Sequence, residues 1–268
     1  MPSKINNQKI LRRIEETYYA LFVDQLPGGL LRPLKAEGVK GRISTINNPF
    51  LNCVGLADVD EAKCQSMISS VIEIYEKEKK GFQWLVGPTT RPKNIDKYLT
   101  ESGFKRIDEE SAFGMVLKDV DIAIDTNEDF KIREVKVGDF EENTSLITKS
   151  FGMGLTDEIA RIIIDLYASQ GKNSHLYLAF TGKNKPVAFS ASVIDPENHL
   201  VILLGAGTLP EYRGKGIYSS FVDRRLKDAG KAGANVAIIQ ALKNTSAPIC
   251  RRLGFEAVCQ LDSYLYSA

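Results

Sequence analysis

The sequence predicts an α+β protein made of two related halves, and three observations support this prediction. Amphipathic helices alternate with short apolar strands along the 268 residues. A polar stretch at 119–129, rich in Asp, Glu, Asn and Thr, reads as a linker. Each half also contains a helix, a Gly-Phe pair and a strand in that order, at 98–105 and 249–256. We therefore predict domains at 1–120 and 130–268, with a mixed, mostly antiparallel sheet flanked by helices.

The first half begins with a predicted helix at 9–24, whose polar side includes Glu15 and Glu16. After it we expect strands at 41–46, 50–56 and 82–86, helices at 60–80 and 94–102, and a last strand ending near 117. The aromatic residues Phe82, Trp84, Tyr18 and Tyr19 either line a substrate pocket or lie in the core. Their residue type favours the core or an interface.

The second half restarts with a predicted strand at 130–135. The expected elements that follow are helices at 140–151 and 157–170, a hairpin of strands at 175–180 and 186–194, a strand at 200–205, a helix at 217–230, a strand at 236–240, a short helix at 247–253 and strands within 257–266. Two helices, a hairpin and a strand–loop–helix–strand unit are typical of an α+β sheet domain.

Charge and composition argue against several classes of protein. Thirty-five Lys and Arg nearly balance 34 Asp and Glu, so we expect no broad nucleic-acid surface. No apolar run approaches the roughly 20 residues of a membrane span, and the N-terminus lacks a signal-peptide core. Cys53, Cys64, Cys250 and Cys259 form no CxxC pair, which predicts neither a metal site nor a disulfide framework. We expect a cytoplasmic monomer or homodimer.

The loop at 206–218 has the features of a phosphate-binding turn. Gly214 and Gly216 carry no Cβ that would hold a ligand away from the backbone. The first amides of the following helix have no intrahelical acceptor and, together with the helix dipole, favour an anion. Arg213 and Lys215 add positive charge. On the loop alone, the alternative of a simple strand-to-helix turn stays open.

The glycine spacing of this loop excludes two common phosphate-binding families. A Walker loop needs a longer spacing that ends in Gly-Lys-Ser/Thr. A dinucleotide fingerprint needs a third glycine at the position that Ser219 occupies. If the loop binds phosphate, these two exclusions leave a different family of phosphate loop.

Residues 208–217, Thr-Leu-Pro-Glu-Tyr-Arg-Gly-Lys-Gly-Ile, resemble the acetyl-CoA loop of GNAT acetyltransferases, whose pattern is Arg/Gln-x-x-Gly-x-Gly/Ala. Arg213 and Gly216 match this pattern, whereas Tyr218 stands where the family has a small residue. Residues 244–255 resemble the family's Asn-x-x-Ala…Tyr-x-x-x-Gly-Phe segment, which lies beside the thioester. The resemblance covers the second half and implies the GNAT acyl-CoA N-acyltransferase fold with acetyl-CoA as cosubstrate.

By this resemblance the coenzyme-binding residues are Thr208, Leu209, Arg213, Gly214, Lys215, Gly216, Ile217, Tyr218, Ser219 and Asn244. The resemblance also implies that the strand ending near Thr208 is splayed from its neighbour and pairs with pantetheine. A bound amine would attack the thioester directly while the Thr208 N–H stabilises the oxyanion. Family members place a Tyr four residues before Gly-Phe to protonate the leaving thiolate. Here that position is Cys250, which is either the acid or a small buried hydrophobe.

The first half resembles a degenerate GNAT repeat that lacks the phosphate loop. Asp58, Asp60 and Glu61 lie at the start of its second helix, and their charges would repel a diphosphate there. We expect this half to pack against or cover the acceptor cleft.

The sequence thus predicts an enzyme that moves an acetyl group from acetyl-CoA to a primary amine of a small molecule or peptide. The alternative is a CoA-binding sensor or scaffold without turnover, favoured by Cys250 and by the absence of Glu from the strand at 200–205. The sequence identifies no general base. A third hypothesis is a tandem transferase that uses a longer acyl donor or a charged tRNA, and the near-neutral charge disfavours the tRNA version.

Overall fold

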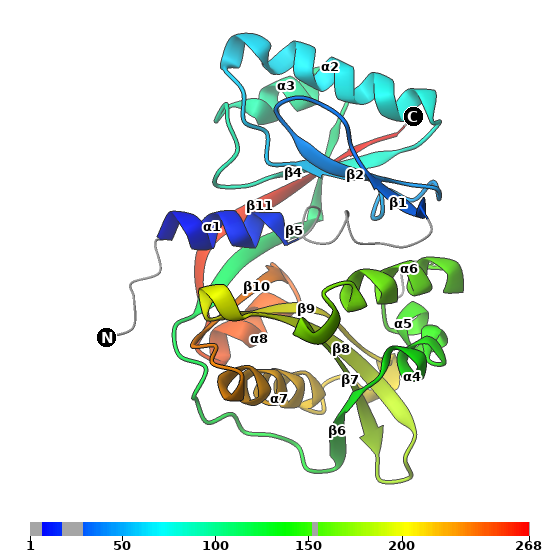
Figure 1. Ribbon diagram of the computed structural model, residues 1–268, viewed down its shortest axis with the longest axis vertical. Coiled ribbons are helices and arrows are strands. Elements are labelled where there is room, and N and C mark those ends of the chain that lie inside the picture. Colours follow the sequence, from blue (N-terminus) through cyan, green and yellow to red (C-terminus); the bar gives the residue numbers. More distant parts are fainter. Residues whose placement is uncertain (1–6, 18–28, 152–154, 268) are drawn as a thin grey trace. The chain divides into compact units, whose positions relative to one another are not determined.

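The computed structural model describes residues 7–17, 29–151 and 155–267 (Figure 1). The chain forms two compact units. The first contains Met1–Met115, Gln240–Arg251 and Glu256–Ala268, and the second contains Val116–Ile239 and Arg252–Phe255. The predicted division into 1–120 and 130–268 follows the order of the chain and stays a prediction. In the structure, Gln240–Arg251 and Glu256–Ala268 group with the first half of the chain.

The first unit is a sheet with helices packed on it. Its elements are α1 (Asn7–Glu16), β1 (Leu31–Pro33), β2 (Lys40–Ser44), β3 (Cys53–Gly55), α2 (Glu61–Lys77), β4 (Phe82–Val86), α3 (Ile95–Glu101), β5 (Lys105–Leu117) and β11 (Glu256–Tyr266). The strand order is β1-β2-β3-β4-β11-β5. Strands β3 and β4 pair in parallel, whereas β1–β2, β2–β3 and β4–β11 are antiparallel. Helices α2 and α3 lie side by side (Figure 1).

The aromatic residues of the first unit form its core. Phe82 and Trp84 are fully buried, and the Phe82 ring stacks on Tyr75 with 4.0 Å between centroids. The core interpretation of Phe82 and Trp84 is therefore confirmed. Tyr18 and Tyr19 lie outside the described residues.

The second unit contains an antiparallel sheet that ends in one parallel pair. Its elements are β6 (Phe130–Val135), α4 (Val137–Glu141), α5 (Thr144–Phe151), α6 (Asp157–Ala168), η3 (Gly171–Asn173), β7 (Ser174–Thr181), β8 (Pro186–Asp195), η4 (Pro196–Asn198), β9 (Leu200–Thr208), η5 (Pro210–Tyr212) and α7 (Ile217–Lys231). Strand β10 (Val236–Leu242) begins in this unit. The order is β10-β9-β8-β7-β6, with only β9–β10 parallel among these pairs. Helices α5 and α6 lie on one side of these strands and α7 on the other (Figure 1).

The predicted internal repeat is visible in local structure. Helix α3 and helix α8 (Ser246–Arg252) each end at a glycine with left-handed backbone, Gly103 at φ 92° and Gly254 at φ 91°. The phenylalanines that follow, Phe104 and Phe255, are both 3% exposed. The Phe104 N–H donates to Leu99 O at 3.0 Å, which is the bond of a Schellman cap. The α+β class with a mixed sheet and flanking helices is confirmed.

Two local predictions were wrong. The single helix expected at 140–151 is interrupted between α4 and α5, because the Asn143 side chain donates to Asp139 O at 2.7 Å and competes with the helical backbone. Glu15, expected on the solvent side of α1, is fully buried. Its carboxylate accepts bonds from the Thr89 N–H, the Thr89 hydroxyl and the Thr90 hydroxyl, at 2.6–2.7 Å. These donors replace the water that a charged group would otherwise need.

Within the described ranges, no helix combines the length and apolar character of a membrane span.

Candidate coenzyme site in the second unit

Helix α7 begins after a turn whose backbone requires glycine. Gly214 has φ 73° and Gly216, the N-cap residue, has φ 75°, a region that other residues rarely adopt. Among the described residues, the amides of Gly214, Lys215, Gly216 and Ile217 have no hydrogen-bond acceptor. These donors lie at the positive end of the helix dipole, so the turn is arranged to receive an anion.

Asn127, in the linker segment, forms hydrogen bonds to this turn and to the first turn of α7. The Asn127 side chain donates to Lys215 O at 3.0 Å, and the Asn127 N–H donates to the Ser220 hydroxyl at 3.2 Å. The Ser220 hydroxyl lies 3.3 Å from Gly216 O, to which it donates. These bonds engage carbonyl groups of the turn and leave its amides unused. Sequence reasoning treated Asn127 only as part of a linker, since nothing local in the sequence connects it to a loop about 90 residues away.

Arg213 closes the turn with its own donors. Its N–H donates to Pro210 O at 3.2 Å, its Nε to Thr208 O at 3.2 Å and its Nη2 to Ser150 O at 2.8 Å. The guanidinium therefore ties the end of β9 to the end of α5. The expected positive charge of Lys215 lies on an exposed side chain, with Nζ 5.1 Å from the centre of the Tyr212 ring.

Strand β9 changes its pairing at a β-bulge. Its parallel ladder with β10 covers Leu200–Leu203. On the other side, Ser192 pairs with Leu203 and Ser190 with Ala206. Two residues of β9, Leu204 and Gly205, therefore oppose the single residue Ala191. The ladder with β10 ends where the bulge begins.

Beyond the bulge, alternate backbone groups of β9 point away from β8. The Leu209 N–H donates to Val187 O at 3.0 Å, which makes these residues a hydrogen-bonded pair. Such pairs alternate along an antiparallel ladder, so Thr208, opposite Ala188, directs its N–H and C=O away from β8. The bond from Arg213 to Thr208 O agrees with this direction. Ala206 has the same orientation, and the ladder with β10 does not extend to either residue. This is the open edge that a splayed strand would offer.

Two glycines of β9, Gly205 and Gly207, lie on the face of the strand toward α5 and α6. A Cβ at Gly205 would collide with the Tyr167 hydroxyl, and one at Gly207 would lie 2.7 Å from the Ser150 Cβ and 2.6 Å from the Phe189 ring. Both glycines are needed for this close approach. The Ser150 hydroxyl is buried and has no hydrogen-bond partner within the described residues.

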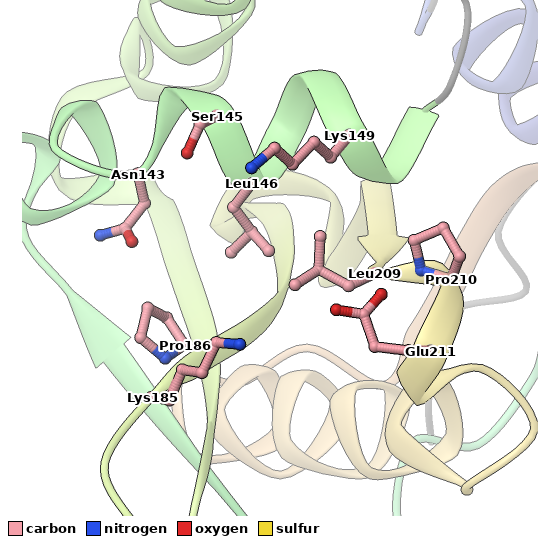
Figure 2. Close-up of a pocket in the computed structure, with 9 residues that line it drawn as sticks. All are labelled: Asn143, Ser145, Leu146, Lys149, Lys185, Pro186, Leu209, Pro210 and Glu211. Carbon is pink, nitrogen blue, oxygen red and sulfur yellow. The ribbon is translucent and has the colours of Figure 1, made fainter.

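A pocket of about 540 Å³ lies beside the end of β9. It is lined by Asn143, Ser145, Leu146, Lys149, Lys185, Pro186, Leu209, Pro210 and Glu211. Figure 2 shows the charged ends of Lys149, Lys185 and Glu211 directed toward its centre from three separate segments. None of the three forms an ion pair with a described residue. The sequence could not predict this pocket, because its lining residues come together only in the folded unit.

The remaining predicted residues lie in the first unit. Asn244 is exposed and Cys250, on α8, is fully buried. The structure therefore brings Thr208, Leu209 and residues 213–219 together in the second unit, whereas Asn244 and Cys250 belong to the first.

The helix start that corresponds to α7 in the first unit is α2. Asp60 is its N-cap residue, and the Glu61 carboxylate accepts bonds from Asn94 at 2.6 Å and Tyr98 at 3.1 Å. These two bonds hold the pKa of Glu61 below its ordinary value. The Arg91 N–H donates to Ala57 O at 2.8 Å, so the chain itself bonds to the segment that follows β3. This helix start is negatively charged.

Comparison with known proteins identifies the second half. Residues 131–258 match the family model described as acetyltransferase (GNAT) domain. This part of the chain therefore resembles a GNAT acetyltransferase domain. The match includes β9, the glycine turn and α7, whose geometry is described above. A search of curated protein sequences finds no significant match.

Solved structures extend the GNAT fold to the whole chain. A GCN5-related N-acetyltransferase from Kribbella flavida is 16% identical, with 88% of this chain and 90% of that chain covered and a TM-score of 0.67. A tandem GNAT protein from the clavulanic acid biosynthesis pathway is 10% identical, with coverages of 97% and 95% and a TM-score of 0.63. A functionally unknown protein from Staphylococcus epidermidis is 13% identical, with coverages of 100% and 99% and a TM-score of 0.63. At these identities the likeness shows the fold, and it covers both halves of this chain.

Proposed function

We propose that this protein is an N-acetyltransferase that moves an acetyl group from acetyl-CoA to a primary amine of a small molecule or peptide. The observation that carries the proposal is the set of unbonded amides at the start of α7, on Gly214, Lys215, Gly216 and Ile217. The diphosphate of coenzyme A is an anion suited to such a cluster of donors. The cytoplasmic location of the protein and its monomeric or dimeric state stay predictions from the sequence.

The other coenzyme contacts follow the direction of the backbone. The diphosphate would accept bonds from the turn and from the first turn of α7, which includes Tyr218 and Ser219. Pantetheine would pair with the open edge of β9 at Ala206. Leu209, whose N–H donates to Val187 O, would contact it through its side chain. Arg213 supports the site by fixing the turn, since its donors are bonded to protein carbonyls. Asn244 joins the proposed site on the family pattern alone.

The chemistry proposed for this site is direct attack of the amine on the thioester carbonyl. The amine nitrogen forms the new C–N bond, and the carbonyl oxygen gains negative charge as it does so. The Thr208 N–H, directed away from β8, would donate to that oxygen. Breaking the C–S bond then releases the thiolate, which takes up a proton, while the amine loses one to a base or to water. Holding the two reactants in line supplies a large part of the rate.

A second candidate is a CoA-binding protein without turnover, and the burial of Cys250 favours it. This side chain occupies the position of the family's proton-donating Tyr and is fully buried. A buried Cys is more often a small hydrophobe than a proton donor. In the transferase proposal, either Cys250 or water must therefore supply the proton.

Two measurements on the purified protein separate these candidates. Calorimetric titration with acetyl-CoA tests binding, and release of free thiol across a panel of primary amines tests transfer. The transferase proposal expects both binding and amine-dependent thiol release. Binding without release on any amine would favour the sensor, and absence of binding would contradict both.

A further inference from the structure

A buried arginine lies at the bulge of β9. Arg225, on α7, is 1% exposed. Its Nη1 donates to Ala191 O at 3.2 Å and to Leu204 O at 3.4 Å, and its Nε donates to Phe221 O at 3.1 Å. Ala191 and Leu204 are the residues that oppose each other where the ladder is offset. One guanidinium thus contacts both strands at the irregularity.

The Arg225 side chain supplies hydrogen-bond donors to backbone carbonyls at the bulge. A bulge disrupts the ladder locally and leaves backbone groups without their regular partners. A buried carbonyl without a donor is costly. The planar guanidinium reaches two carbonyls in fixed geometry, which an ammonium group does not. On the opposite face, the Tyr167 hydroxyl packs directly on Gly205. The bulge is therefore held from the α7 face by Arg225 and from the α6 face by Tyr167.

The offset determines which amides of β9 are available. With the bulge, Val187 lies opposite Leu209 and bonds to it. If the register of Ser192 and Leu203 continued along the same residues without the bulge, Val187 would lie opposite Thr208. The Thr208 N–H would then bond to β8 instead of pointing away from it. The one-residue offset is what gives Thr208 its outward direction.

We propose that Arg225 is a positioning residue for coenzyme binding, because it fixes the bulge that directs the Thr208 and Ala206 amides outward. This inference rests on the proposed function. Arg225 does not contact the coenzyme in this account. It acts through the backbone of β9.

The test compares Arg225→Met and Arg225→Lys with wild-type protein, with Arg224→Met as the control. Arg224 is the neighbouring arginine on α7, and its Nε binds Asp228 at 2.7 Å. Acetyl-CoA affinity is measured by calorimetry and the thermal midpoint by circular dichroism. We expect Arg225→Met to weaken binding by about tenfold or more, Arg225→Lys by less, and Arg224→Met by less than about twofold. A merely structural role would lower the thermal midpoint and leave the affinity of the folded protein unchanged.

The outcomes are distinguishable. Folded Arg225→Met with wild-type affinity overturns the inference. Where Arg225→Met does not fold, Gly205→Ala decides, because its Cβ displaces the bulge from the Tyr167 side. Weakened binding by folded Gly205→Ala supports the inference, and unchanged affinity overturns it. Wild-type protein that binds no acetyl-CoA overturns the proposed function itself, and this inference with it.

Discussion

Helix α7 of the second unit and helix α2 of the first occupy equivalent places, yet their N-termini differ in chemistry. Each helix follows a strand, β9 or β3, that pairs in parallel with the next strand, β10 or β4. Before α7, two glycines adopt left-handed backbone and the amides of the turn have no acceptor in the described part of the chain. Before α2, the Asp58 N–H donates to Gly38 O at 2.8 Å, and Asp58, Asp60 and Glu61 bring negative charge.

The strand edges show the same contrast. Past the parallel ladder, β9 turns backbone groups outward, whereas the chain after β3 is bonded to the loop after β4 through Arg91. In the first unit the carboxylate of Glu15 also fills the space over Gly87 in that loop. The comparison indicates that the fold places helix N-termini in equivalent positions at α7 and α2. A few local residues then determine which of the two is suited to an anion.

The largest expected effect is that of Gly216→Asp. The new side chain would strain a residue at φ 75° and place an anion among the amides that we assign to the diphosphate. We expect acetyl-CoA binding to weaken by about 3 kcal/mol, or roughly a hundredfold, in a calorimetric titration. The matched change at the other helix start, Asp60→Gly, should leave the affinity unaltered. Wild-type affinity in Gly216→Asp would remove the proposed difference between α7 and α2.

Glu15→Ala should affect folding rather than binding. It leaves the Thr89 N–H and two hydroxyl groups without their acceptor inside the first unit. We expect the free energy of unfolding to fall by about 2 kcal/mol in urea titrations, with acetyl-CoA affinity unchanged. Glu16→Ala is the control, because Glu16 makes only partly exposed ion pairs with Arg12 and Arg13. A large loss of affinity in Glu15→Ala would show that the first unit contributes to coenzyme binding.

Asn127→Ala should have a smaller effect on the second unit. It removes the side-chain bond to Lys215 O and so loosens the turn from behind. The expected loss is about 1 kcal/mol of acetyl-CoA binding, or about fivefold, by calorimetry. Asn94→Ala is the counterpart at α2, where the side chain donates to Glu61, and it should leave the affinity unchanged. Equal effects of the two variants would contradict the assignment of the site to α7 alone.

The smallest expected effect is a change in the pKa of Glu61, at the start of α2, in the variant Asn94→Ala. Hydrogen bonds from Asn94 and Tyr98 lower the pKa of Glu61. A carboxylate whose pKa is lowered in the folded protein stabilises the fold at pH values above its ordinary pKa of 4.5. This stabilisation is lost as the pH falls through the folded pKa. In Asn94→Ala, carbon-detected NMR should show the pKa of Glu61 moving up toward 4.5. An unchanged pKa would mean that Asn94 does not hold the charge at this helix start.

Sequence reasoning was most successful where local patterns determine structure. Helix and strand periodicity located most elements, and the Gly-Phe pairs at 103–104 and 254–255 marked equivalent helix ends. The glycine pattern located the turn before α7, whose backbone angles bear out the need for Gly214 and Gly216. The coenzyme contacts of that turn stay a prediction.

Features that depend on distant residues could not be predicted in this way. The helical pattern predicted Glu15 on the polar side of its helix. That prediction failed because the groups that bond to its carboxylate, on Thr89 and Thr90, are more than 70 residues away in the sequence. The role of Arg225 has no signal in its own segment, since the bulge carbonyls that it binds belong to two other segments. Pairing of the last strand β11 with β4 likewise leaves no signal in either strand alone.

The most direct test of the central claim is a crystal structure of the protein with acetyl-CoA bound. The account predicts the diphosphate at the start of α7, within hydrogen-bond distance of the amides of Gly216 and Ile217, and no coenzyme at α2. A diphosphate bound elsewhere, or an empty turn in crystals that hold acetyl-CoA at another site, would contradict it.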